Sequence, residues 1–89
     1  MIKYQRVDNI FQKQIGKSLC LLKNKGNFVY KINHTAFFLW ELLEKKQTKK
    51  SLSIALSNEY KISTSKAQQD VEDFLEYYIA EKLIKKTSN

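Results

Sequence analysis

The chain has 89 residues, of which 43% are hydrophobic and 28% charged, and its formal net charge is +7. This length allows one small domain, so we expect residues 1–89 to form a single domain whose core is built from large apolar side chains. The basic surplus fits a nucleic acid, an acidic membrane or an acidic polypeptide as partner, and the position of the charge along the chain decides among them.

The single cysteine, Cys20, excludes an internal disulfide and any all-cysteine metal cluster. It lies in the apolar segment "SLCLLK", which favours a buried, inert thiol. The single histidine, His34, has no partner residues at a metal-ligand spacing, so no metal site is expected. The N-terminus lacks a signal-peptide core, and no apolar run approaches the roughly 18 residues of a membrane span. We therefore expect a cytoplasmic protein that does not associate with membranes.

Three strands are expected in the first third of the chain. Apolar or alternating patterns predict the first in "VDNIFQKQ" (residues 7–14), the second in "SLCLLK" (18–23) and the third in "FVYKI" (28–32). Gly16 permits the first turn, and "KNKGN" (23–27) is typical of a hairpin loop because Asn and Gly tolerate positive φ.

The third strand leads directly into the expected centre of the domain. Phe28, Tyr30 and Ile32 occupy alternate positions of the strand, which predicts that they face the core. Asn33 ends the strand and is a good N-cap, because its side chain accepts a hydrogen bond from a free backbone N–H. "HTAFFLWELLEKK" (residues 34–46) then predicts a helix whose apolar stripe is wide enough to be covered on more than one side.

Two further helices are expected after this one. Thr48 can cap the second, "KKSLSIALSNEY" (residues 49–60), and Ser63 or Ser65 can cap the third, which runs to about Lys82. The second helix has a narrow apolar stripe formed by Leu52, Ala55, Leu56 and Tyr60. The third has a broader one formed by Ala67, Val71, Phe74, Leu75, Tyr78 and Ile79.

The predicted order of elements is three strands, three helices and a short tail, "LIKKTSN" (residues 83–89). Strands followed by helices predict an α+β domain, with a three-stranded antiparallel sheet packed on a helical bundle. The second and third helices are joined by a short link and form a helix-turn-helix unit. The fold class is therefore a winged helix-turn-helix, with a three-stranded antiparallel sheet followed by three helices.

The sequence contains no motif that predicts catalysis or a cofactor. It has no Gly-rich phosphate loop, no serine nucleophile elbow and no His–Glu pair suited to a zinc hydrolase. The carboxylates of the third helix are interpreted as a solvated face, because no apolar pocket is implied that would raise a carboxyl pKa. We therefore expect a binding module that is not an enzyme and uses no cofactor.

A winged helix-turn-helix suggests a DNA-binding regulator, with the third helix in the major groove. Between Ser63 and Lys82, however, the chain has five carboxylates and two lysines, and such a helix is repelled by phosphate. The alternative of a winged-helix DNA-binding regulator is thus disfavoured, and no specific nucleic acid is expected as partner. A small adaptor that pairs through a strand edge is a third possibility, so the expected state is a monomer or weak dimer.

An open sheet edge offers another kind of partner a place to bind. Unpaired N–H and C=O groups along an edge strand accept an extra strand from a second chain. Provided that the third strand is this edge and lies beside the third helix, the two elements form a groove. An extended peptide would then add a strand there and direct its apolar side chains toward Phe74.

Three segments, in order, resemble the family of the pyrroloquinoline quinone biosynthesis protein D (PqqD), over residues 4–84. The pattern "Y-x-I/L-N-x-T-A-x-x-x-W-x-L-L" is matched by Tyr30, Ile32, Asn33, Thr35, Ala36, Trp40, Leu42 and Leu43. A Thr that opens a helix, two apolar residues and an aromatic are matched by Thr48, Leu52, Leu56 and Tyr60. The pattern "D-V-x-x-F-L-x-x-L" is matched by Asp70, Val71, Phe74, Leu75 and, with Tyr in place of Leu, Tyr78. The chain departs from the family at "EKKQ", where an Asp-Gly turn is usual, and at Glu81 or Lys82, where Gly is common.

The resemblance implies a stand-alone recognition element for ribosomally synthesised, post-translationally modified peptides. Such domains bind the leader of a precursor peptide, as a strand beside the third strand and the third helix, and present it to a modifying enzyme or leader peptidase. The peptide-binding residues implied by position are Val29, Tyr30, Lys31, Ile32, Lys66, Ala67, Asp70, Asp73, Phe74 and Tyr77. Lys31 would also steer an acidic leader toward the groove.

Overall fold

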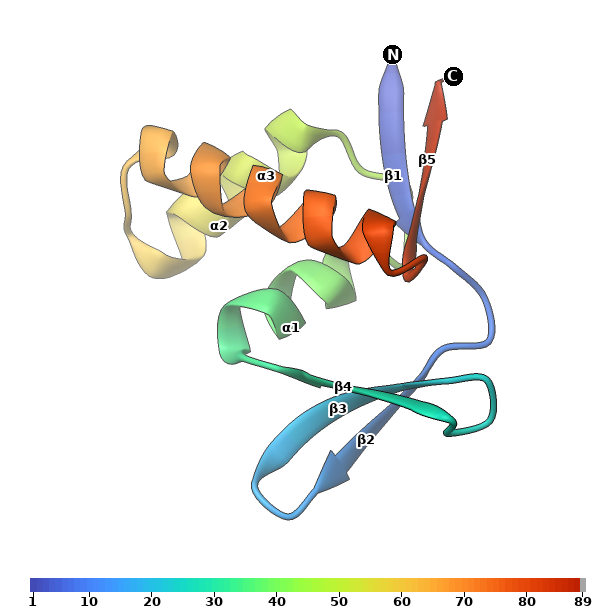
Figure 1. Ribbon diagram of the computed structural model, residues 1–89. Helices are drawn as coiled ribbons and strands as arrows, with labels where there is room; N and C mark the ends of the chain where they lie inside the picture. The colour runs from blue at the N-terminus through green and yellow to red at the C-terminus, as the bar shows by residue number, and fades with distance from the viewer. Residues whose placement is uncertain (89) are drawn as a thin grey trace.

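In the computed structural model, which describes residues 1–88, four strands are followed by three helices and a fifth strand around one apolar core (Figure 1). Their bounds, in chain order, are β1 (Ile2–Arg6), β2 (Phe11–Ile15), β3 (Ser18–Lys23), β4 (Phe28–Ile32), α1 (His34–Leu42), α2 (Lys49–Tyr60), α3 (Thr64–Ala80) and β5 (Ile84–Ser88). The predicted α+β class and the three-stranded sheet followed by three helices are confirmed.

The strands form two separate antiparallel sheets. One has the order β2-β3-β4 and contains the three predicted strands, although the first begins at Phe11 instead of at residue 7. The other pairs β1 with β5, from Ile2 opposite Ser88 to Arg6 opposite Ile84. The segment after residue 82, predicted only as a short tail, therefore contains a strand, β5. Apolar and polar residues alternate in β1, from Ile2 to Gln5, so this strand was missed although its pattern permits one, whereas β5 has only Ile84 as an apolar residue. The two segments pair although they lie at opposite ends of the chain.

The end of α1 is set by a contact that is distant in sequence. The predicted helix ran to residue 46, but α1 ends at Leu42. Beyond it, Gln47 exchanges two backbone hydrogen bonds with Tyr4, at 2.7 and 2.8 Å, and its side chain donates to the Leu42 carbonyl at 3.0 Å. These bonds bring the chain across to β1 and replace the last helical turn.

The three predicted helix starts are capped by side chains. Asn33 accepts from the backbone N–H of Ala36 at 2.8 Å, and Thr48 forms a capping box with Ser51. Ser63 is the cap of α3, which ends at Ala80, two residues before the predicted end. These caps fix where each helix leaves the loop before it, and Asn33 thereby joins α1 directly to the end of β4.

The core lies between the β2–β4 sheet and the helices, which cover one face of that sheet (Figure 1). Leu21 and Ile32 reach it from the sheet, and α1 supplies the fully buried Trp40. The buried side chains are Tyr4, Leu21, Ile32, Leu39, Trp40, Leu43, Leu52, Leu56, Ala67, Val71, Phe74, Leu75, Tyr78, Leu83 and Ile84. Two core predictions are wrong, because Phe28 is 51% and Tyr60 41% exposed at the ends of their elements.

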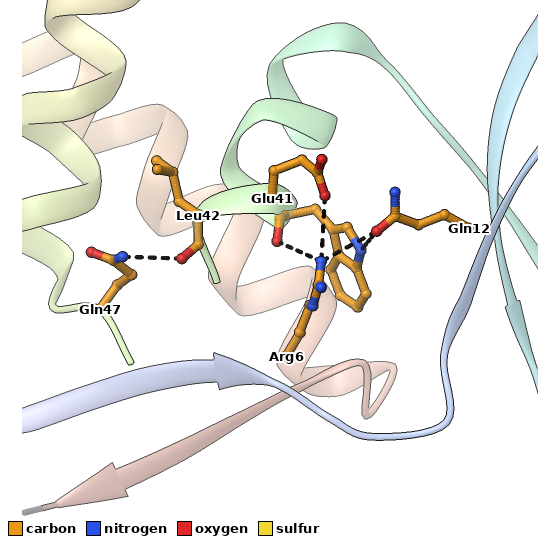
Figure 2. A network of polar contacts seen from close by, with 6 residues as sticks. Arg6, Gln12, Glu41, Leu42 and Gln47 are labelled. Atoms are coloured by element: carbon orange, nitrogen blue, oxygen red, sulfur yellow. Dashed lines mark hydrogen bonds and ion pairs between the residues drawn. The ribbon is translucent and has the colours of Figure 1, made fainter. Parts of the chain in front are cut away.

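A polar network connects the two sheets to α1 (Figure 2). The Arg6 guanidinium donates to Gln12 at 3.2 Å and to the Trp40 carbonyl at 3.4 Å, forms an ion pair with Glu41 at 3.5 Å, and lies 5.5 Å from the centroid of the Trp40 ring. Gln12 also accepts from the indole N–H of Trp40 at 3.1 Å. The polar atom of the largest core side chain is thereby satisfied at the edge of the core.

Candidate functional site

β4 has one free edge. The strand order β2-β3-β4 places it at the margin of its sheet, and within residues 1–88 its only strand partner is β3. Alternate backbone N–H and C=O groups of an antiparallel edge strand point away from its partner. The condition that the sequence analysis required for strand addition is therefore met by β4.

A cavity of about 410 Å³ lies beside this edge, between β4, the start of α1 and one side of α3. Its lining is formed by Lys31, Ile32, Asn33, Thr35, Ala36, Leu39, Asp70, Asp73, Phe74, Tyr77 and Tyr78. We call this cavity and the adjoining edge of β4 the groove. The cap at Asn33 positions it, because the same residue ends the strand and starts the helix that together form two of its sides.

The floor of the groove is apolar and aromatic. The Phe74 and Tyr78 rings stack with centroids 4.2 Å apart, and the centroids of the Tyr78 and Trp40 rings are 6.4 Å apart. Both floor rings are largely buried, and burial, followed by the charge of neighbouring Tyr77, raises the pKa of Tyr78 to about 12. The phenol is therefore neutral at physiological pH, and the floor offers a preformed apolar surface.

The rim of the groove carries opposite charges on its two sides. Lys31 lies on the strand side, and Asp70 and Asp73 lie on the helix side. The Lys66 ammonium forms a 2.7 Å ion pair with Asp70, and this hydrogen bond raises the pKa of Lys66. The Gln69 amide donates to Asp73 at 2.9 Å. Because these contacts are exposed, they orient the carboxylates more than they stabilise the fold.

The middle of β4 and the end of β3 are both bonded to the end of α3. The Tyr30 hydroxyl donates to the Glu81 carboxylate at 3.1 Å, and the Lys23 ammonium donates to the Glu81 carbonyl at 2.6 Å. The family pattern commonly has Gly at Glu81 or Lys82, and Lys82 is the one with a positive φ, 60°. At this helix exit the side chain and the carbonyl of Glu81 are bonded to the sheet. This contact connects β4 to the end of α3, the two elements between which the groove lies.

The structure brings six of the ten residues expected from sequence to the groove lining: Lys31, Ile32, Asp70, Asp73, Phe74 and Tyr77. The other four are near it. Val29 and Tyr30 lie on β4 outside the lining, Lys66 pairs with Asp70 at the rim, and Ala67 is fully buried in the core. Whether any of them binds a peptide stays a prediction.

The contribution of α1 to the groove was missed from sequence. Thr35, Ala36 and Leu39 line it from α1, and Asn33 does so from the cap. Their helical spacing was assigned to the core, but the small side chain of Ala36 is a signal of a hollow: it leaves room where the rest of the apolar stripe has large residues. Among residues 1–88, no group of three His, Cys, Asp or Glu side chains could hold a metal ion.

Comparison with known proteins gives a family and a fold. Residues 19–84 match the family model described as coenzyme PQQ synthesis protein D (PqqD). A solved chain described as TbiB1 in complex with the TbiA(beta) leader peptide superposes with a TM-score of 0.78 at 19% sequence identity, covering 96% of this chain and 99% of that chain. No curated protein matches the sequence. Within the described residues, no helix is both long and apolar enough to cross a membrane.

Proposed function

Because the chain belongs to the PqqD family, we propose that it captures the leader segment of a ribosomally synthesised precursor peptide and presents it to a modifying enzyme or leader peptidase. It acts as a single stand-alone domain and catalyses no step itself. The observation that carries the proposal is the unpartnered edge of β4 beside an apolar groove. The similar fold of a chain solved with a leader peptide supports it.

The leader binds as a fourth strand of the β2–β4 sheet. Its backbone pairs with the free N–H and C=O groups of residues 28–32, which supplies affinity without regard to sequence. Because successive side chains of a strand point to opposite faces, every second leader residue enters the groove, where Phe74 and Tyr78 form the floor. The sequence preference of the module therefore comes from these inward positions.

The charges of the rim set the orientation of the leader. Lys31 favours an acidic residue on the strand side, whereas Asp73 favours a basic or polar residue on the helix side. The charge of Asp70 is compensated by Lys66. Lys31 is exposed, so its effect is on the rate and salt dependence of association more than on the final affinity.

A titration combined with hydrogen exchange tests the proposal. A fluorescently labelled leader from the precursor encoded beside this gene should bind saturably, with a Kd between about 1 nM and 1 µM. Backbone amides of residues 28–32 should gain protection in the complex, and those of residues 11–15, on the opposite edge of the same sheet, should not. A scrambled leader and a generic DNA duplex are the controls.

Two results would contradict the proposal. Absence of saturable binding to the precursor would remove the function itself. Saturable binding that protects β2 as strongly as β4, or neither strand, would leave leader recognition standing and remove the mode of binding proposed for it.

A further inference from the structure

The β2–β4 sheet has a second face that residues 1–88 leave uncovered. All three helices lie on one side of this sheet (Figure 1). The register places Gln12 opposite Leu21 and Leu21 opposite Tyr30. The residues of this row point toward the helices, where Leu21 is fully buried. Their neighbours along each strand therefore point the other way, and we call the surface that they form the outer face.

An apolar row crosses the outer face. The register places Phe11 opposite Leu22 and Leu22 opposite Val29, so one residue from each strand contributes. Phe11 is 60% and Val29 55% exposed, and Leu22 is half-buried between them. Directly opposed side chains of this kind have Cβ atoms about 4.5–5.5 Å apart. The three side chains therefore form one continuous apolar strip, not scattered exposed residues.

A basic row runs beside the apolar one. Lys13 is opposite Cys20, which is opposite Lys31. Cys20 is only 5% exposed, yet it is not part of the apolar core beneath the sheet. The two lysines therefore flank the buried Cys20 in the register of the sheet.

No negative charge balances these lysines within the segment that forms the sheet. Residues 9–40 contain five lysines and no Asp or Glu, whereas α3 has four carboxylates and one lysine. Lys17 and Lys25 add positive charge in the two turns of the sheet. A second copy docking face to face would place lysine against lysine, so self-association through this face is opposed by like charges.

We propose that the outer face docks the enzyme that processes the leader, through an acidic surface with an apolar centre on that enzyme. The inference rests on the proposed function, because it assigns the partner of the same recognition module to a second surface. An apolar strip beside a charged row matches the apolar centre and polar rim of a protein interface. A nucleic acid would instead find an apolar strip in which Phe11 alone has an aromatic ring that can stack with a base.

The outer face and the groove share β4, which couples the two binding events. A leader added to the edge of β4 continues the sheet, so every second leader residue points to the same side as Val29 and Lys31. The enzyme therefore contacts a larger surface when the leader is in place. By linkage, leader and enzyme each bind more tightly in the presence of the other.

A double variant on β2, the strand farthest from the groove, tests the docking face. Phe11→Ser combined with Lys13→Glu removes an apolar contact and reverses a charge. The matched control is Ile54→Ser with Lys50→Glu on α2, where Ile54 is 47% exposed. The probes are the labelled leader and the modifying enzyme or leader peptidase encoded beside this gene. Two readouts are needed: the Kd of the leader and the processing of the precursor as a function of enzyme concentration.

We expect the β2 variant to bind the leader within about twofold of the wild type and to need roughly tenfold or more enzyme for half-maximal processing. The α2 control should match the wild type in both readouts. Equal processing by the β2 variant, or an equal loss in the control, would overturn the inference. The inference would also be overturned if the wild type formed a concentration-dependent dimer, or bound a DNA duplex or anionic vesicles, and the β2 variant lost that binding while processing stayed unchanged.

Failure of the proposed function is distinguished by the leader titration. If the wild type does not bind the leader, the proposed leader recognition is wrong. The affinity of the enzyme for the chain alone, measured for the wild type and the β2 variant, then still decides whether the outer face docks the enzyme. If the leader binds and the β2 variant processes normally, only the docking face is wrong.

Discussion

Filling the groove from α1 is the most direct test of where the leader side chains go. Ala36 is half-buried, lines the cavity and contributes only a methyl group to it. In the variant Ala36→Leu the larger side chain projects into the space of about 410 Å³ that the groove leaves open. Leucine is as compatible with a helix as most residues, and the cap at Asn33 uses the backbone N–H of residue 36, so the local fold is retained.

The expected magnitude follows from the burial that is lost. If the new side chain displaces one apolar leader residue from the floor, the complex loses about 1.5–3 kcal/mol of apolar burial. This free energy corresponds to a Kd that is about 10 to 150 times higher. Fluorescence anisotropy with the labelled leader measures this change, and far-UV circular dichroism with thermal unfolding shows whether the variant is folded.

Ala55→Leu is the matched control, because Ala55 is half-buried on α2 and is not part of the groove lining. We expect it to leave the Kd of the leader unchanged within about twofold, a change of less than 0.5 kcal/mol by the usual conversion. A folded Ala36→Leu variant that bound the leader as tightly as the wild type would refute the assignment of the cavity as the binding site. An equal loss of affinity in Ala55→Leu would show that the effect is not local.

Three further changes test other parts of the molecule. Lys31→Glu should slow association of the leader at low salt and reduce the salt dependence of the association rate, and stopped-flow rates that agree with the wild type at both low and high salt would disprove steering by this lysine. Because burial raises the pKa of Tyr78 to about 12, the folded state favours the neutral phenol, and its contribution to stability is complete below about pH 10 and is lost as the pH rises toward 12. In the Tyr78→Phe variant, the free energy of unfolding should fall less between about pH 10 and 12 than in the wild type, as measured by denaturant unfolding at increasing pH. A pH profile identical to that of the wild type would contradict the burial argument. Arg6→Ala removes the hydrogen bonds and the cation–π contact with Trp40 and should lower the free energy of unfolding by about 1–3 kcal/mol, whereas an unchanged melting temperature would show that the network adds no stability.

Local patterns were sufficient to predict the parts of the fold that depend on neighbouring residues. The β3–β4 hairpin has an Asn- and Gly-containing loop, and its strands show apolar or alternating sequences. The caps at Asn33, Thr48 and Ser63 are local too, because each side chain bonds to a backbone N–H three residues on. The sequence indicated these elements, but it left open whether β4 is the edge of its sheet, which the strand order β2-β3-β4 supplies.

What the sequence could not provide depends on contacts between distant residues. The pairing of β1 with β5 joins opposite ends of the chain, and the end of α1 depends on the bonds between Tyr4 and Gln47. The groove lining was incomplete for a similar reason. Ala36 and Ala67 both lie on apolar stripes, and only the packing of the helices shows that the first faces the groove and the second the core.

The pairing of β1 with β5 has a practical consequence. It holds Ile2 opposite Ser88, so both ends of the described chain emerge side by side, on the far side of the helices from the β2–β4 sheet (Figure 1). This end of the molecule is thus a place to attach a fluorescent tag or a surface linker without obstructing β4. The whole domain can also be inserted here into a loop of a host protein. The domain is therefore suited to insertion into other proteins as a unit.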